Sequence, residues 1–239
     1  MGMPIVVDVR DDRVDDDVLE RMFAWLHEVD ATFSTYRSDS VISRIARFEL
    51  AREDAPADVR AVLDRCDELR DETGGYFDAF YGGRLDPSGL VKGWAVDRAA
   101  AILAGAGLRN FAVNAGGDIR LRGAALPGAQ WRIGIQHPLE RGAVAAVVAG
   151  TDLAIATSGE YARGRHILDP HTGSPPVGLL SVTITGPDLA TADAYATAAF
   201  AMGERGARWA ATRAGYEALC ILADRRVLST PGFPRVGDG

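Results

Sequence analysis

The sequence lacks several signatures that would place the protein in a common class. Its only two cysteines, Cys66 and Cys220, lie far apart in hydrophobic contexts, so we predict buried free thiols and no zinc site or disulfide framework. It has no Walker A or GxGxxG motif, and Ser158 lacks the GxSxG spacing of a hydrolase nucleophile. Any nucleotide must therefore be bound by a different motif.

Long apolar runs and clustered positive charge are also missing. No run reaches the length of a membrane span, and the N-terminus has neither a basic region nor a lipid-attachment cysteine. We therefore expect no membrane span, no export signal and a cytoplasmic protein. The 239 residues carry a net charge of −7, which argues against nucleic acid as a partner because affinity for a nucleic-acid backbone needs clustered lysine and arginine.

Lysine is almost absent. Lys92 is the only lysine among the 26 basic residues. A slim ammonium fits beside a phosphate or a buried carboxylate where the wide arginine fork does not. Gly93 follows it and lets the backbone approach a neighbour closely. Residues 86–89 predict a turn before a helix over 91–103, although a capped helix with an incidental lysine is an alternative.

What is present is an ordinary globular composition, with 47% hydrophobic and 25% charged residues. The apolar spacing predicts helices over 14–32, 41–47, 56–70, 91–103, 191–202 and 204–214. It predicts strands over 4–10, 110–114, 118–122, 131–136, 144–149, 153–157, 166–168, 180–185 and 216–222. Because helices gather in the first third and strands in the middle, we predict an α+β fold.

A small-residue segment near the C-terminus carries a candidate metal site. Asp193 and Thr197 are four residues apart, so on a helix they share one face. One carboxylate and one hydroxyl among alanines suit Mg²⁺, which takes few protein ligands and completes its shell with water and phosphate oxygens. The alternative is an aspartate stabilised by the helix dipole and a threonine bonded to its own backbone.

A candidate base lies in the segment RHILDPHTG. His166 can change protonation near neutral pH and could take a proton from a hydroxyl. The alternative is a histidine packed on a strand, with Asp169 forming the turn that follows. His171 falls within that turn, so we expect it to be exposed.

Seven segments occur in order along the chain: FSTYRSDSVISRI, GGYFD, DPSGLVKGWAVD, NAGGDIR, ATSGEYAR, HILDPHTG and TADAYATAAFAMG. Together they resemble the ApbE family of FAD:protein FMN transferases over nearly the whole chain. The resemblance implies mixed, largely antiparallel sheets flanked by helices, in two closely joined lobes with the site in the cleft between them. It implies a single domain over 1–239, which could be built from two intertwined lobes, with a loose Pro/Gly-rich tail at 230–239.

The resemblance implies an activity and a set of site residues. The family cleaves FAD, attaches FMN through a phosphoester to a threonine of a target flavoprotein and releases AMP, with Mg²⁺, or Mn²⁺ in its place. The implied metal ligands are Asp193, Thr197 and the backbone carbonyl of Gly89. The implied FAD contacts are Met3, Tyr36, Tyr76, Phe77, Asp78, Asp86, Lys92 and Ser181. The implied catalytic residues are Lys92, which would neutralise phosphate charge, and His166, which would activate the acceptor hydroxyl.

The chain departs from the family pattern at two places. Ala46 stands where an asparagine near the FAD pocket is usual, and the segment between Asp78 and Asp86 is shorter than in many members. Two other functions remain open from the residues alone: an Mg²⁺-dependent FAD pyrophosphatase that makes FMN and AMP, and a non-catalytic FAD-binding protein. Only the product formed in the presence of an acceptor protein separates the transferase from the pyrophosphatase.

Overall fold

The computed structural model describes residues 2–159 and 167–237. Its helices are α1 (Asp16–Phe33), α2 (Val41–Ala46), α3 (Ala57–Glu72), α4 (Ser88–Gly105), α6 (Leu189–Ala201) and α7 (Glu204–Ala210), with a short 3₁₀ turn η1 (Arg52–Asp54). Its strands are β1 (Ile5–Val9), β2 (Phe80–Tyr81), β3 (Arg84–Leu85), β4 (Phe111–Ala115), β5 (Asp118–Arg122), β6 (Trp131–Gln136), β7 (Val144–Gly150), β8 (Ala154–Gly159), β9 (Leu179–Gly186), β10 (Glu217–Leu222) and β11 (Val227–Ser229).

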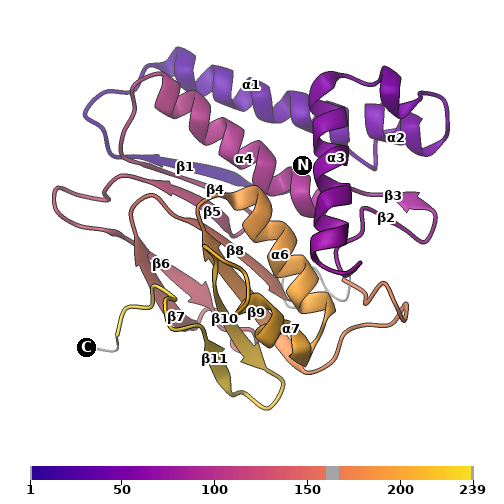
Figure 1. Ribbon diagram of the computed structural model, residues 1–239. Helices are drawn as coiled ribbons and strands as arrows, with labels where there is room; N and C mark the ends of the chain where they lie inside the picture. The colour runs from indigo at the N-terminus through magenta and orange to yellow at the C-terminus, as the bar shows by residue number, and fades with distance from the viewer. Residues whose placement is uncertain (1, 160–166, 238–239) are drawn as a thin grey trace.

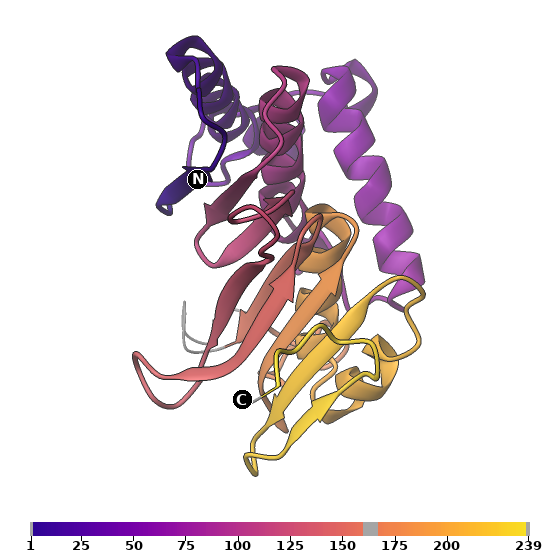
Figure 2. The ribbon, with the colours of Figure 1, turned by 90° about the vertical axis from the view of Figure 1, so that its left-hand side faces the viewer.

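A seven-stranded sheet in the order β1-β4-β5-β8-β9-β10-β11 forms the centre of the molecule, and all its pairs are antiparallel. Two further pairs, β2–β3 and β6–β7, are antiparallel ribbons. Figure 1 shows α1 and α4 side by side, with α6 over β8 and β9. Figure 2 shows β1, in indigo, and the C-terminal hairpin, in yellow, at opposite ends of the sheet. The predicted α+β class with largely antiparallel sheets flanked by helices is confirmed; the single domain over 1–239 stays a prediction.

The sheet separates two hydrophobic cores because successive side chains of a strand point to opposite faces. Phe111 and Val113 of β4 belong to the larger core, which the helices cover. Ala112, between them, belongs to the smaller core, which Trp131 and Val148 of the β6–β7 ribbon cover. The helical face is the one that carries the candidate site residues of α4 and α6.

The packing of α4 against α6 is unusually close. A Cβ added to Gly93 would overlap the backbone of α6, because it would lie only 2.8 Å from the Cα of Ala190. Helix α6 is alanine-rich and buried on nearly every side, which is typical of a helix inside a core. Glycine on one helix and alanine on the other therefore bring Lys92 and Asp193 within reach of each other.

Most predictions of helix caps and element bounds are confirmed, and the exceptions lie where tertiary contacts set the bounds. Ser40 caps α2 by accepting a hydrogen bond from the Ser43 N–H, as its position predicts. The helix expected over 14–32 begins two residues later than predicted and continues one residue further, because α1 runs from Asp16 to Phe33. The strand expected over 166–168 is wrong for Ile167 and Leu168, which lie in no strand, and His166 is outside the described residues.

The C-terminal segment differs from the loose tail that the sequence predicts. Arg235 forms an antiparallel bridge with Val148, and the N–H of Val236 donates to the carbonyl of Val147 at 2.8 Å. Phe233 is buried in the smaller core. The described part of the tail therefore adds to the edge of the β6–β7 ribbon. Among the helices of the described ranges, none has the length and apolar character to cross a membrane.

The two cysteines lead to a first testable prediction. Both are unpaired and buried, and burial raises the pKa of Cys66 and of Cys220 to about 12. Because the thiolate is the reactive form, we expect neither to react with a disulfide reagent at about pH 8 in the native protein. Both should react once denaturant unfolds the chain. Rapid labelling of either thiol in the native protein would contradict this burial.

Candidate active site

The site is organised around the ammonium of Lys92, which lies between two buried carboxylates. Lys92, in the second turn of α4, forms an ion pair with Asp118 Oδ2 at the start of β5. Its Nζ also lies 3.3 Å from Asp193 Oδ1 on α6. The two carboxylate side chains are 2% and 3% exposed, whereas that of Lys92 is 19% exposed. The side chain of Lys92 is therefore the most exposed of the three.

Burial and charge act in opposite directions on these groups. Burial lowers the pKa of Lys92, but the charges of Asp193 and Asp118 outweigh it and hold the pKa above its ordinary value. Burial raises the pKa of Asp193, and the attraction of Lys92 opposes that rise. Two carboxylates and one ammonium leave an excess of negative charge, so the site favours a further cation.

Asp193 provides the observation that tests a metal at this place. Its Oδ2 is buried and has no hydrogen-bond partner among the residues that the structure describes. A buried carboxylate oxygen without a partner is costly unless a ligand satisfies it. Thr197 lies one turn further along α6, and its Oγ1 is 3.7 Å from the position that a Cβ on Gly89 would occupy. Asp193 and Thr197 thus carry oxygen donors of the kind that a hard divalent cation prefers, with Gly89 beside Thr197.

The first turn of α4 connects this region to the turn that follows α3. Phe77 is buried, and its ring edge lies 3.1 Å from where a Cβ on Gly89 would be. The Oγ1 of Thr73 accepts a hydrogen bond from the Phe77 N–H at 2.9 Å. Phe77 is therefore a core residue that shapes the site, and its ring is not free to stack on a ligand. Next to it, Asp78 faces a cavity.

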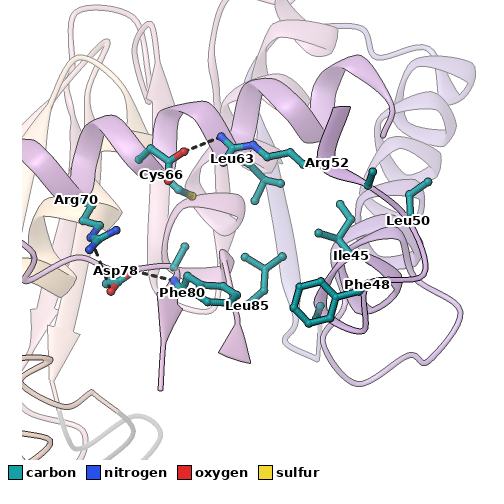
Figure 3. Close-up of a pocket in the computed structure, with 14 residues that line it drawn as sticks. Ile45, Phe48, Leu50, Arg52, Leu63, Cys66, Arg70, Asp78, Phe80 and Leu85 are labelled. Carbon is teal, nitrogen blue, oxygen red and sulfur yellow. Dashed lines mark hydrogen bonds and ion pairs between the residues drawn. The ribbon is translucent and has the colours of Figure 1, made fainter. Parts of the chain in front are cut away.

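That cavity has a volume of about 520 Å³ and opens between α2, α3 and the β2–β3 hairpin. Its apolar walls include Ile45, Ala46, Leu63, Cys66 and Leu85, and Arg70 and Asp78 lie at one end. Figure 3 shows the labelled side chains converging from the three elements, with Arg70 and Asp78 close together at one end. Phe48 is 90% exposed and has a left-handed φ of 59°. The size and apolar lining suit a flat aromatic ring.

Tyr76 belongs to a separate cluster that ties three segments together. Its hydroxyl accepts a hydrogen bond from Arg205 of α7 at 2.6 Å. Its ring packs edge-on against His171, with 4.5 Å between ring centroids, and His171 Nε2 lies 3.0 Å from the carbonyl oxygen of Gly74. His171 is exposed, as its position in a turn predicts. This cluster fixes the turn at residues 169–173 beside the turn that contains Phe77 and Asp78.

The remaining predicted residues are more scattered. Asp86 accepts a hydrogen bond from the Ser88 N–H at 3.0 Å, at the entry to α4. Met3 contacts the Gly116 turn, which leads into Asp118. Tyr36 is 99% exposed, so an FAD contact there would be at the surface. Ser181 is buried in β9, with no hydrogen-bond partner for its Oγ among the described residues. The predicted base, His166, lies outside the described residues.

Asp118 is a site residue that the sequence reasoning did not assign. It stands at the end of NAGGD, where Gly116 and Gly117 take left-handed φ values of 61° and 104°. A double-glycine turn that delivers a carboxylate at a strand start was the available signal. The cavity gave no comparable signal, because its walls come from three separate elements whose packing together no local pattern states.

Asp97 anchors the helix that carries Asp193 and leads to a prediction on stability. It accepts hydrogen bonds from the N–H groups of Leu189 and Ala190 at 2.8 and 2.9 Å. Burial raises the pKa of Asp97 from 3.8 to about 6, although these N–H groups and Arg120 oppose the rise. The folded chain therefore binds this proton more tightly than the unfolded chain, and Asp97 lowers stability as pH rises from about 4 to about 6.

Asp97→Asn keeps an acceptor oxygen and removes the charge. Relative to the parent, its free energy of unfolding should therefore improve by up to roughly 3 kcal/mol as pH rises through that window. Urea unfolding of both proteins at several pH values measures the difference. A difference that does not change with pH would contradict the raised pKa.

Comparison with known proteins agrees with this geometry. The model of the ApbE family matches residues 1–84 and 81–220. The chain belongs to the ApbE family. This confirms the resemblance inferred from the seven segments. The matched residues include all three members of the triad, Lys92, Asp118 and Asp193.

Relatives of this ApbE chain are FAD:protein FMN transferases. The Vibrio cholerae protein of that name is 40% identical over 130 residues, which are 50% of this chain and 39% of the relative. The Rhodobacter capsulatus protein of that name is 36% identical over 159 residues, which are 62% of this chain and 30% of the relative. The matched segments thus span well under half of these relatives.

Solved structures support the fold along the whole chain. The flavin transferase ApbE from Vibrio cholerae superposes with a TM-score of 0.86 and 27% identity, covering 99% of this chain and 96% of that structure. The ApbE protein from Thermotoga maritima superposes with a TM-score of 0.83 at 22% identity, covering 98% of this chain and all of that one. This second likeness supports the fold alone.

Proposed function

We propose that this ApbE chain is an Mg²⁺-dependent FAD:protein FMN transferase, which attaches FMN to a threonine of an acceptor flavoprotein and releases AMP. One observation carries the proposal. The Asp193 carboxylate has Oδ1 at 3.3 Å from Lys92, and its buried Oδ2 has no hydrogen-bond partner in the part of the chain that the structure describes. A cation held at Oδ2 and an ammonium at Oδ1 would meet the two halves of a diphosphate. The names of the relatives supply the reaction class.

The metal would be held by Asp193, Thr197 and the Gly89 carbonyl. When bound, a divalent cation supplies Lewis-acid stabilisation of charge on the phosphoryl oxygens. Lys92 adds a point charge for a phosphate oxygen, and its partial exposure leaves it accessible to a ligand. Mn²⁺ has the same preference for oxygen ligands, so it should substitute for Mg²⁺.

The rest of FAD would extend from this point along the α3–α4 connection. The backbone from Phe77 to Asp78 joins the Gly89 region to the 520 Å³ cavity, so a dinucleotide could place a flat ring there. Ala46 lines this cavity. A smaller residue than the family's usual asparagine would leave more room for that ring. Met3, Tyr36, Tyr76, Asp86 and Ser181 stay predicted FAD contacts.

The chemistry would be a single displacement at the phosphorus of the FMN moiety. The threonine oxygen of the acceptor forms the new P–O bond, the P–O bond to the AMP phosphate breaks, and AMP leaves. His166 would receive the hydroxyl proton. The burial of Asp118 and Asp193 would limit water near the phosphorus, and that would favour an alcohol over hydrolysis.

The experiment that tests this proposal is a transfer assay with FAD, Mg²⁺ and an acceptor flavoprotein. We expect flavin fluorescence that stays with the acceptor after denaturation and gel separation, and none when Mg²⁺ is chelated. An acceptor whose target threonine is replaced by alanine is the matched control. Release of FMN and AMP without any labelled acceptor would support the pyrophosphatase instead. Intact FAD after long incubation with Mg²⁺ would support a non-catalytic binding protein.

A further inference from the structure

We propose that Asp118 is a positioning residue for the cation site: it holds the ammonium of Lys92 at a distance from Asp193, so that Asp193 keeps an oxygen available for the metal. The inference rests on the proposed function, because it concerns the same site. Neither the relatives nor the resemblance assigns a role to this carboxylate.

The geometry of Lys92 shows an uneven sharing between its two partners. Its Nζ makes the shorter contact with Asp118 Oδ2, whereas Asp193 Oδ1 lies 3.3 Å away. The second oxygen of Asp193 has no partner among the described residues. The ammonium thus lies nearer to Asp118 than to Asp193, and within the described residues Asp193 Oδ2, like Asp118 Oδ2, makes no hydrogen bond.

Asp118 is fixed by contacts that do not involve Lys92. Its Oδ1 accepts a hydrogen bond from the Thr157 N–H of β8 at 3.0 Å. The preceding turn is closed by a bond of 2.9 Å from the Gly117 N–H to Asn114 Oδ1. The ladder between β5 and β8 begins at the next residue, where Ile119 pairs with Ile155. The Asp118 carboxylate therefore adds one hydrogen bond to the end of the β5–β8 ladder, and the sheet fixes its position.

Removing the charge of Asp118 should change the position of the Lys92 ammonium. A buried ammonium needs a charged or hydrogen-bonding partner, and Asp193 is the other carboxylate beside it. Lys92 would then move onto Asp193, and its charge would compete with a divalent cation for the same oxygens. Asp118 would act on cation affinity through Lys92, without touching the metal.

The single lysine makes this inference directly measurable. Because Lys92 is the only lysine, protein grown with ¹³C- and ¹⁵N-labelled lysine gives one set of lysine side-chain signals in NMR spectra, and the signal to follow is that of the ε-methylene group. Mn²⁺ should broaden this signal in the unsubstituted protein, and the titration gives a dissociation constant. In Asp118→Asn we expect the signal to shift before any metal is added. We also expect a dissociation constant for Mn²⁺ about tenfold higher, which is the effect of losing one modest interaction.

Two further variants act as controls. Asp11→Asn changes another carboxylate that accepts N–H groups, those of Arg109 and Asn110, and should leave both the signal and the Mn²⁺ affinity unchanged. Asp118→Glu keeps the charge and should restore part of the affinity. If Asp118→Asn does not fold, Asp118→Glu becomes the test, with a shifted signal and an Mn²⁺ affinity below that of the parent; a parental affinity would overturn the role of Asp118.

The outcomes separate this inference from the proposed function. An Asp118→Asn protein that folds and binds Mn²⁺ with parental affinity would overturn the role of Asp118 and leave the cation site standing. A lysine signal in the unsubstituted protein that Mn²⁺ does not broaden would overturn the cation site itself. A shift together with weaker Mn²⁺ binding in Asp118→Asn, and neither in Asp11→Asn, is the result expected here.

Discussion

Replacing Asp193 with asparagine is expected to lower kcat/KM for FMN transfer about 10³-fold, because Lewis-acid stabilisation is worth several kcal/mol and each ~1.4 kcal/mol is a factor of ten. Asp193 is the only carboxylate among the proposed metal ligands. Asparagine has nearly the same shape, so the tightly packed α4–α6 contact should survive. FAD binding should be weakened far less than transfer, since the cavity is not altered. Initial rates of covalent labelling and a separate FAD titration measure the two effects.

Asp188→Asn is the matched control in the same helix. Asp188 caps α6 by accepting the Thr191 N–H at 2.8 Å, and asparagine is an equally good cap. This variant should keep most of its activity. An Asp193→Asn protein that is folded and within tenfold of the parental rate would contradict the metal site.

Gly93→Ala is expected to destabilise the fold by about 3 kcal/mol, at the upper end of what overpacking usually costs. The added Cβ would overlap the carbonyl of Leu189 and the backbone at Ala190, neither of which can rotate away as a side chain would. The helices must then separate, which also pulls Lys92 away from Asp193. For a chain of this size the loss corresponds to a fall in Tm of roughly 6–12 °C. Calorimetry or circular dichroism measures it.

Gly105→Ala tests whether the effect belongs to the close packing. Gly105 ends the same helix, and a Cβ there would meet nothing within 4 Å. Alanine favours the helix over glycine by up to about 1 kcal/mol, so this variant should be neutral or slightly more stable. Equal losses in the two variants would show that the α4–α6 contact is looser than described.

The most accurate predictions from sequence were those of helices and strands that a local residue pattern defines. The strands over 118–122 and 131–136 have the predicted bounds, because their side chains alternate between two faces and turns flank them. The β2–β3 hairpin was missed, since strands of two residues are too short to show a period. The end of α1 was placed too early because the packing of Phe33 in the core extends the helix beyond its local signal.

The site shows the same limit more clearly. The spacing of Asp193 and Thr197 predicted that they share one helix face, and the family resemblance assigned Lys92 to the same site. No spacing rule could have placed Asp118 against Lys92, because the contact depends on how β5 lies beneath α4. The same is true of the cavity, whose walls meet only after α2 and α3 pack together. Contacts between elements far apart in sequence are fixed by topology, which local patterns do not encode.

The central claim is that a divalent cation and the Lys92 ammonium together bind the diphosphate of FAD. A crystal structure with FAD or AMP and Mg²⁺ tests it most directly. We predict Mg²⁺ at about 2.1 Å from oxygens of Asp193 and Thr197, with a phosphate oxygen completing its shell and another beside Lys92 Nζ. A diphosphate bound far from both charges, or a metal that does not touch Asp193, would contradict the account.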